Sequence, residues 1–190
     1  MFIQTEATPN PEVLKFLPGR EVFPDGTRDF RSPLEAQASP LATQLFDIDG
    51  VDRVYFGADF ITVGKDADHD WPVLKAPVLA AIMDHFTSGR PLFADGDAES
   101  AGHDVTVYEG ETAQVVAEIK ELLDSRIRPA VAQDGGDILF SRFEPDTGVV
   151  WLHMKGACSG CPSSTATLKS GVENMLKHYV PEVTRVEQTL

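Results

Sequence analysis

The sequence predicts an α/β chain of the α+β type, folded as two small sandwich domains, each a short sheet covered by helices. Three observations predict this fold class. Strand-like runs alternate with amphipathic helical runs, turn residues separate them, and an acidic stretch divides the chain near its middle. The 190 residues are enough for two small domains. We assign residues 1–89 to an amino-terminal domain, 90–110 to a linker and 111–190 to a carboxy-terminal domain.

The first domain begins with short strands and a capped helix. Residues 2–8 and 12–19 have the apolar and β-branched content of strands, and a Pro-Asn-Pro turn separates them. Residues 39–50 predict a helix, because a serine cap is followed by proline at the first helical position and a glycine ends the run. Residues 51–57 and 59–65 predict a hairpin.

A longer helix is expected to close the first domain. Over residues 71–89, Leu74, Val78, Ile82 and Phe86 recur at four-residue spacing, which is typical of a helix with one apolar face. Pro77 lies inside this run, and proline removes a helical hydrogen bond. The sequence therefore predicts either a bend at this proline or a helix that starts later.

The stretch between the domains, residues 90–110, is acidic and poor in regular pattern. It carries five acidic residues and one basic residue, and it is rich in Gly, Asp, Ala and Ser. It lacks a sustained apolar period apart from a short Val-Thr-Val-Tyr run. We expect a mostly solvated tether.

The second domain is predicted to follow the order helix, strand, strand, helix, strand. The first helix ends at a Gly-Gly pair. Two strands joined by Pro-Asp-Thr-Gly come next, and an amphipathic helix stopped by Pro181 precedes a final edge strand. The apolar faces of the two helices are expected to hold Val116, Ile119, Leu123 and Ile127 in the first, and Leu168, Val172, Met175, Leu176 and Tyr179 in the second.

Composition excludes several classes of function. The formal net charge is −14 and the pI is near 4.6, so nucleic acid and anionic membrane surfaces would repel the chain. No stretch approaches the roughly 20 apolar residues that span a bilayer, and the first residues do not read as a targeting signal. Two cysteines make no disulfide framework, so we expect a reducing compartment, namely the bacterial cytoplasm or, for a mature eukaryotic form, the mitochondrial matrix.

The only two cysteines, Cys158 and Cys161, lie in the stretch GACSGCPSS between a predicted strand and a predicted helix. Gly156 and Gly160 permit turn conformations there, and Pro162 suits a first helical turn. A helix amino terminus stabilises thiolates, so we expect lowered thiol pKa values and accessible sulfurs. Because metal ligands must be thiolates, this turn favours binding of a soft metal.

A single Cys-x-x-C leaves three interpretations open, namely a redox dithiol, a zinc site and half of a site shared by two chains. A thioredoxin-like fold does not fit, because only one helix and one strand follow the cysteines. Zinc needs four ligands, and the histidines show no paired spacing. Strand alternation places His153 on the sheet surface. Two chains together offer the four thiolates of a [2Fe–2S] or [4Fe–4S] cluster.

Two longer stretches resemble the Nfu family. RPAVAQDGGDILF with GACSGCPSSTATLKSGVE resembles its NifU-type domain, and TEATPNPEVLKFLPG with SPLATQLFDIDGVDRVYFGADFITV resembles its amino-terminal domain. The resemblance implies an iron–sulfur cluster scaffold or carrier and not an enzyme. Cys158 and Cys161 would bind a [4Fe–4S] cluster shared in a homodimer, which receives it from upstream assembly proteins and passes it to apo iron–sulfur enzymes. The cysteine-less first domain would then serve recognition or stability.

Two other motifs receive simpler interpretations. Asp134, Gly135 and Gly136 match the family motif, but Gly-Gly after a periodic helix is the usual helix stop, so we interpret them as a turn into the strand. Arg126 and Arg128 are interpreted as a solvated cationic helix end that opposes the helix dipole.

Overall fold

The computed structural model describes residues 2–94, 107–159 and 162–189, and the side chains of residues 162–165 lie outside that description. Across the described residues the chain divides into two compact units, Met1–Ala101 and Gly102–Leu190. The architecture is of the predicted α+β type, with a separate sheet in each unit. Among the described helices, none has the length and apolar character needed to cross a membrane.

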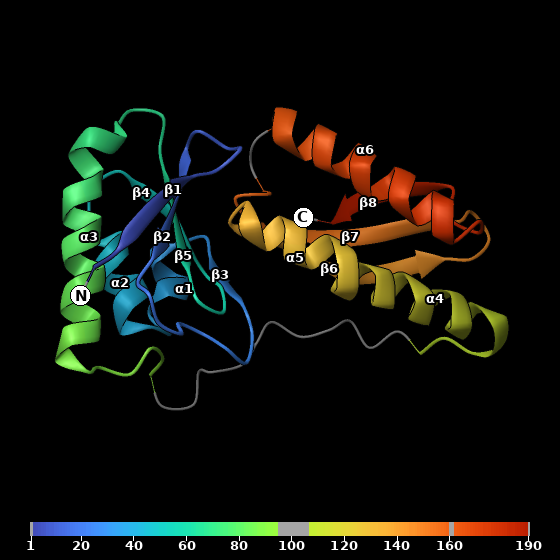
Figure 1. The fold of residues 1–190 in the computed structure, drawn as a ribbon, viewed down its shortest axis with the longest axis horizontal. Helices are drawn as coiled ribbons and strands as arrows, with labels where there is room; N and C mark the ends of the chain where they lie inside the picture. Colours follow the sequence, from blue (N-terminus) through green and yellow to red (C-terminus); the bar gives the residue numbers. More distant parts are fainter. Residues whose placement is uncertain (1, 95–106, 160–161, 190) are drawn as a thin grey trace. The chain divides into compact units, whose positions relative to one another are not determined.

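The described part of the first unit builds a five-stranded antiparallel sheet in the order β1-β2-β5-β4-β3 (Figure 1). Strands β4 and β5 form the predicted hairpin. Strand β3 was not predicted, because three residues are too few to show alternation. The strands are β1 (Gln4–Ala7), β2 (Val13–Leu17), β3 (Arg28–Phe30), β4 (Val51–Phe56) and β5 (Ile61–Lys65).

Three helices of the first unit pack on this sheet, namely α1 (Pro33–Ala36), α2 (Pro40–Phe46) and α3 (Trp71–Ser88). The predicted cap of α2 is present, since the backbone N–H of Ala42 donates to Ser39 Oγ at 3.3 Å. Helix α3 begins at Trp71 and contains Pro77, so the later start considered for it is wrong. The shared core contains Phe16, Phe30, Phe56, Leu41, Leu45, Val54, Ile61, Val63, Val78 and Ile82.

Both described ends of the predicted linker pack against a domain. Leu92 and Phe93 pack against the first core, and the Phe93 ring centroid lies 4.8 Å from that of Phe23. Tyr108 belongs to the second unit, where its hydroxyl accepts a 2.7 Å hydrogen bond from the backbone N–H of Phe143. The expected solvated tether therefore does not extend to these residues, and residues 95–106 lie outside the described part of the chain.

The described residues of the second unit form a three-stranded sheet in the order β6-β7-β8 (Figure 1). Strands β6 (Gly136–Glu144) and β7 (Val149–Gly156) pair antiparallel, and β8 (Arg185–Thr189) pairs parallel with β7. Helix α6 (Pro162–Tyr179) connects the parallel pair, as a crossover between parallel strands requires. The predicted order of elements is confirmed.

The first helical segment of this unit is interrupted by a wider turn. Helix α4 (Gly110–Leu122) continues through a π-helical turn, η1 (Leu123–Ile127), into α5 (Arg128–Gln133). The sequence predicted one regular helix. Pro129 has no N–H, and its ring would clash with the carbonyl four residues earlier, so an extra residue in the turn relieves the conflict. The predicted apolar residues are all buried: Val116, Ile119, Leu123 and Ile127.

Both helical segments cover the same face of the small sheet. The alternate β7 residues Val150, Leu152 and Met154 belong to one core that also contains residues of α4, α5 and α6. Tyr179 was predicted on this apolar face but is 42% exposed, and Val180 is buried instead. The core of this unit therefore lies between the sheet and two helical segments, next to the end of β7 that leads to the cysteines.

Candidate functional site at the cysteine turn

The cysteines follow the end of β7, as the sequence predicted. Ser159 closes a turn back to Gly156, with its N–H and its Oγ donating to the Gly156 carbonyl at 3.1 and 3.0 Å. Gly156 has φ of 62°, a left-handed value that side chains disfavour. Cys158 lies inside this turn, and α6 begins at Pro162. Cys161 lies outside the described residues, as does Gly160.

Cys158 is part of the hydrophobic core. It is 5% exposed and packs in the same cluster as Ile138, Met154 and Val172. The sequence led us to expect an accessible sulfur, and for this cysteine in the single chain that expectation is wrong. Position at a strand-to-helix turn does not by itself expose a side chain, because the turn folds back over the core.

The pKa of the Cys158 thiol moves in the opposite direction to the predicted one. Burial, together with the negative charges of Asp134 and Asp137, raises it to about 12. Removing the thiolate from water penalises the charged form, and this desolvation is the largest cause of the raised pKa. At neutral pH the sulfur of the single chain therefore carries its proton.

The Asp-Gly-Gly motif is joined to the cysteine turn. Gly135 has φ of 82°, which fits the predicted helix stop, and its carbonyl accepts a 3.2 Å hydrogen bond from Ala157 N–H. Gly136 pairs with Gly156 across the hairpin. A Cβ at Gly136 would lie 2.4 Å from Cys158 Sγ. The interpretation as a turn is correct but incomplete, since β6–β7 pairing places the motif beside the cysteine.

Arg128 is not the solvated cation that the sequence suggested. Its Nε and second terminal nitrogen donate to the two carboxylate oxygens of Asp137 at 2.8 and 2.9 Å, and it also pairs with Asp124 at 2.9 Å. The hydrogen bonds that Arg128 donates to Asp137, foremost among these contacts, raise the pKa of Arg128. Asp137 is 4% exposed and accepts a hydrogen bond from Ile138 N–H. A bidentate pair thus fixes a carboxylate next to the cysteine turn.

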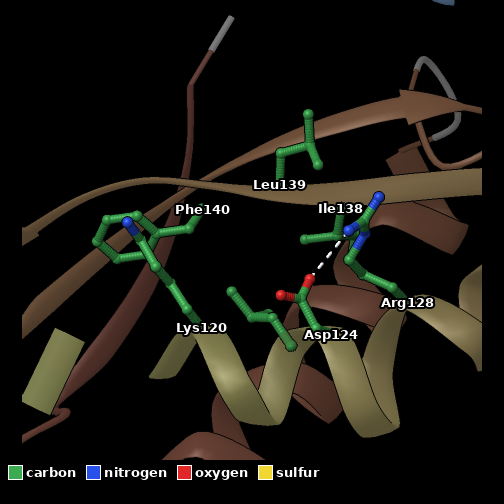
Figure 2. A pocket seen from close by; sticks show the side chains of 7 residues that line it. Lys120, Asp124, Arg128, Ile138, Leu139 and Phe140 are labelled. Atoms are coloured by element: carbon green, nitrogen blue, oxygen red, sulfur yellow. Dashed lines mark hydrogen bonds and ion pairs between the residues drawn. The ribbon is translucent and has the colours of Figure 1, made fainter. Parts of the chain in front are cut away.

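A small pocket lies beside this ion pair, between α4, η1 and β6 (Figure 2). Its volume is about 160 Å³. Lys120 Nζ lies 5.1 Å from the centre of the Phe140 ring, and Asp124 faces Arg128 across the pocket. The lining residues are Lys120, Leu123, Asp124, Arg128, Ile138, Leu139 and Phe140. The lining contains no cysteine or histidine, so it offers no soft-metal ligand.

His153 lies on the sheet as predicted. It is half-buried, and its Nδ1 is 3.3 Å from Thr189 Oγ1 on the neighbouring strand. Within residues 2–94, 107–159 and 162–189, no group of three or more His, Cys, Asp or Glu side chains is arranged to hold a metal ion. The described side chains of one chain therefore do not complete a metal site around Cys158.

Both units match known domain families. Residues 3–89 match the model described as "Scaffold protein Nfu/NifU N terminal", and residues 119–187 match the "NifU-like domain". Two relatives are similar along nearly the whole chain: NifU-like protein 5, mitochondrial, of Arabidopsis thaliana (54% identity) and the human NFU1 iron-sulfur cluster scaffold homolog, mitochondrial (51% identity).

The chain belongs to the Nfu family. The matches cover 99% of this chain and 68% of the Arabidopsis protein, and 100% of this chain and 72% of the human protein. NifU-like protein 4, mitochondrial, of Arabidopsis is 55% identical, and the chain spans 66% of its length. The predicted family is thus confirmed. The prediction of a scaffold and not an enzyme agrees with the descriptions of the matched amino-terminal domain and of the human relative.

Proposed function

We propose that this chain is an iron–sulfur cluster scaffold and carrier without catalytic activity. Two chains form a homodimer around one [4Fe–4S] cluster, with Cys158 and Cys161 of each chain supplying the four thiolates. The supporting observation is the strand-to-helix turn of Cys158, tied to the Asp-Gly-Gly turn by the Ala157–Gly135 hydrogen bond. A [2Fe–2S] cluster fits the same four ligands.

The environment of Cys158 suits cargo that is held for a time and then released. Each thiol must lose its proton before it binds iron, and for Cys158 a pKa of about 12 in the single chain makes that loss costly. At neutral pH the loss of this proton lowers the apparent affinity of the thiol for metal. Loading is therefore favoured as the pH rises.

The raised pKa and the burial of Cys158 argue against the alternative of a dithiol oxidoreductase. Nucleophilic cysteines of such enzymes have lowered pKa values and partial exposure, whereas Cys158 has neither. A zinc-binding interaction module remains the other alternative, and metal analysis separates it from a cluster carrier.

The partners follow from the carrier function. We propose apo iron–sulfur enzymes as clients and upstream cluster-assembly proteins as donors. Residues 1–89 contain no cysteine, so we assign this domain to client recognition or to stability. The proposed compartment is the bacterial cytoplasm or the mitochondrial matrix, where thiols stay reduced.

Anaerobic reconstitution tests the function directly. The expected product contains roughly four iron and four sulfide per two chains, because four thiolates hold one cubane cluster. Cys158→Ser and Cys161→Ser should each remove the cluster. One tightly bound zinc per chain with no sulfide would overturn the proposal, and full occupancy in either variant would show that the cysteine is misassigned.

A transfer experiment tests the carrier role separately. Loaded protein is mixed with an apo [4Fe–4S] enzyme, with and without an iron chelator, and recovered activity is followed. Direct exchange between thiolates predicts that activation continues in the presence of the chelator. Complete inhibition by the chelator would mean that iron passes through solution, and the chain would then bind a cluster without carrying it.

A further inference from the structure

Gly136 leaves the space that the sulfur of Cys158 occupies. A Cβ at position 136 would lie 2.4 Å from Cys158 Sγ, 2.7 Å from the Lys155 carbonyl oxygen and 3.1 Å from Cys158 N. The first two distances are shorter than side-chain carbons tolerate from other heavy atoms, and the third is tight. Gly136 is not among the glycines with positive φ, so its backbone conformation is open to other residues. Glycine is required here for space, and not for conformation.

The inward position of the sulfur conflicts with metal binding. Cys158 is 5% exposed and packs among core residues, whereas a ligand shared with a second chain has to face that chain. The backbone around it is held by the Ala157–Gly135 hydrogen bond and by the closure of Ser159 onto Gly156. Cys158 can therefore bind a metal shared with a second chain only after its side chain has turned out of the core.

We propose that Gly136 is a positioning residue that sets the balance between an inward Cys158 side chain, seated against the glycine, and an outward one that binds iron. The proposal rests on the carrier function above. In the inward state the sulfur is shielded from oxidants and from stray metal ions. A side chain at position 136 would occupy the space of the inward sulfur and would also press on the Lys155 carbonyl oxygen, so it shifts the balance toward the outward side chain.

Alkylation of the apo-protein measures this balance. The Cys161→Ser chain has Cys158 as its only thiol, and its reaction with iodoacetamide is followed by mass spectrometry at constant pH. We expect the native chain to react at least about a hundredfold more slowly than the same chain in denaturant, because a buried group reacts only after local opening. Gly136→Ala should accelerate the native reaction by roughly tenfold or more.

A second glycine supplies the matched control. Gly171 lies in α6, and a Cβ there would meet nothing within 4 Å. Gly171→Ala should leave the alkylation rate of Cys158 unchanged. Equal rates for Gly136→Ala and its parent would overturn the proposal, as would an equal acceleration by Gly171→Ala.

The parent chain gives an independent answer if Gly136→Ala does not fold. A local side-chain movement exposes little surface, so the alkylation rate should stay nearly constant at urea concentrations below the unfolding transition. A rate that rises steeply from the lowest urea concentrations would show that only global unfolding exposes the sulfur. That result would refute the inward–outward balance.

These measurements contain no iron, so they separate this proposal from the proposed function. The alkylation rates can follow the predictions while reconstitution yields no cluster. In that case the carrier function is wrong, and the role of Gly136 in making room for the inward sulfur stands. If the cluster forms normally and Cys158 of the native apo-protein reacts as fast as in denaturant, the seating role fails and the carrier function stands.

Discussion

The cores of the two units differ in what they contain. The first unit buries large aromatic side chains, among them Phe16, Phe30 and Phe56, and residues 1–89 have no cysteine. The core of the second unit is mainly aliphatic, and it includes Cys158, the residue that we assign to function. Under the proposed function, Cys158 of the second unit contributes both to core packing and to the cluster site.

The difference indicates that the residue proposed as a ligand does not have to lie at the surface of the single chain. A buried thiol adds packing and keeps its proton, and both effects must be reversed when it binds metal. Substitutions in the core of the second unit should therefore alter cluster binding, whereas those in the first core should alter stability alone.

Paired core truncations should give the largest effects. Phe56→Ala, at a fully buried ring, should lower the free energy of unfolding of the first unit by about 3–5 kcal/mol, and Leu152→Ala should cost the second unit about 2–5 kcal/mol. Iron and sulfide uptake should fall only for Leu152→Ala. Urea unfolding and metal analysis provide the measurements. Equal loss of uptake in both variants would show that the units are not independent.

Breaking the buried ion pair should cost less. Arg128→Met leaves the Asp137 carboxylate buried without its bidentate partner, and we expect a loss of about 2 kcal/mol in the free energy of unfolding. This is less than the roughly 3–5 kcal/mol of a fully buried pair, because the guanidinium side chain is 34% exposed.

The neighbouring arginine is the control for this variant. Arg126 contacts the exposed Tyr179, so Arg126→Met should cost less than about 1 kcal/mol. Similar losses in the free energy of unfolding for the two substitutions, measured with urea, would mean that the Arg128–Asp137 pair stabilises the second unit no more than an exposed contact does.

Removing residues 90–94 should lower the stability of the first unit by a smaller amount. A fragment of residues 1–94 retains Leu92 and Phe93, which pack against the first core, and a fragment of residues 1–89 lacks them. We expect both to fold and to bind no iron, with the shorter one less stable by about 1–2 kcal/mol because apolar surface is lost. Circular dichroism and thermal unfolding would show this, and equal stabilities would exclude residues 90–94 from the domain.

The pH dependence of Cys158 should give the smallest effect. Its pKa is raised from 9.0 in the unfolded reference to about 12 in the folded chain, so the folded state holds its proton more tightly. This contribution to stability is fully present below pH 9 and is lost as the pH rises toward 12. Relative to Cys158→Ala, the parent should lose about 1.4 kcal/mol between pH 7 and pH 10.

Unfolding of the parent and of Cys158→Ala at both pH values cancels the titration of every other group. A difference that does not change with pH would mean that the thiol is no harder to ionise in the folded chain. It would also remove the argument that folding adds to the proton cost of cluster loading.

Much of the fold could be predicted from the sequence because it depends on local patterns. Alternation and turn residues predicted the β4–β5 hairpin, and the serine cap with its following proline predicted α2. Strand β3 and the π-helical turn were missed, since a three-residue strand has no usable period and a widened turn keeps the helical spacing of apolar residues. The predicted exposure of Cys158 failed because burial depends on neighbours distant in sequence.

The sequence alone was enough to predict the order of elements in the second unit, the family, and the position of the two cysteines after a strand and before a helix. These follow from spacing between residues close in the chain and from motifs that do not need coordinates. The tertiary structure alone decided that Gly136 faces Cys158, that Arg128 pairs with Asp137, and that the Cys158 thiol is buried with a raised pKa. Desolvation and steric contact are set by strand pairing and packing, which bring Gly136 against Cys158 and Arg128 against Asp137 only once the chain has folded.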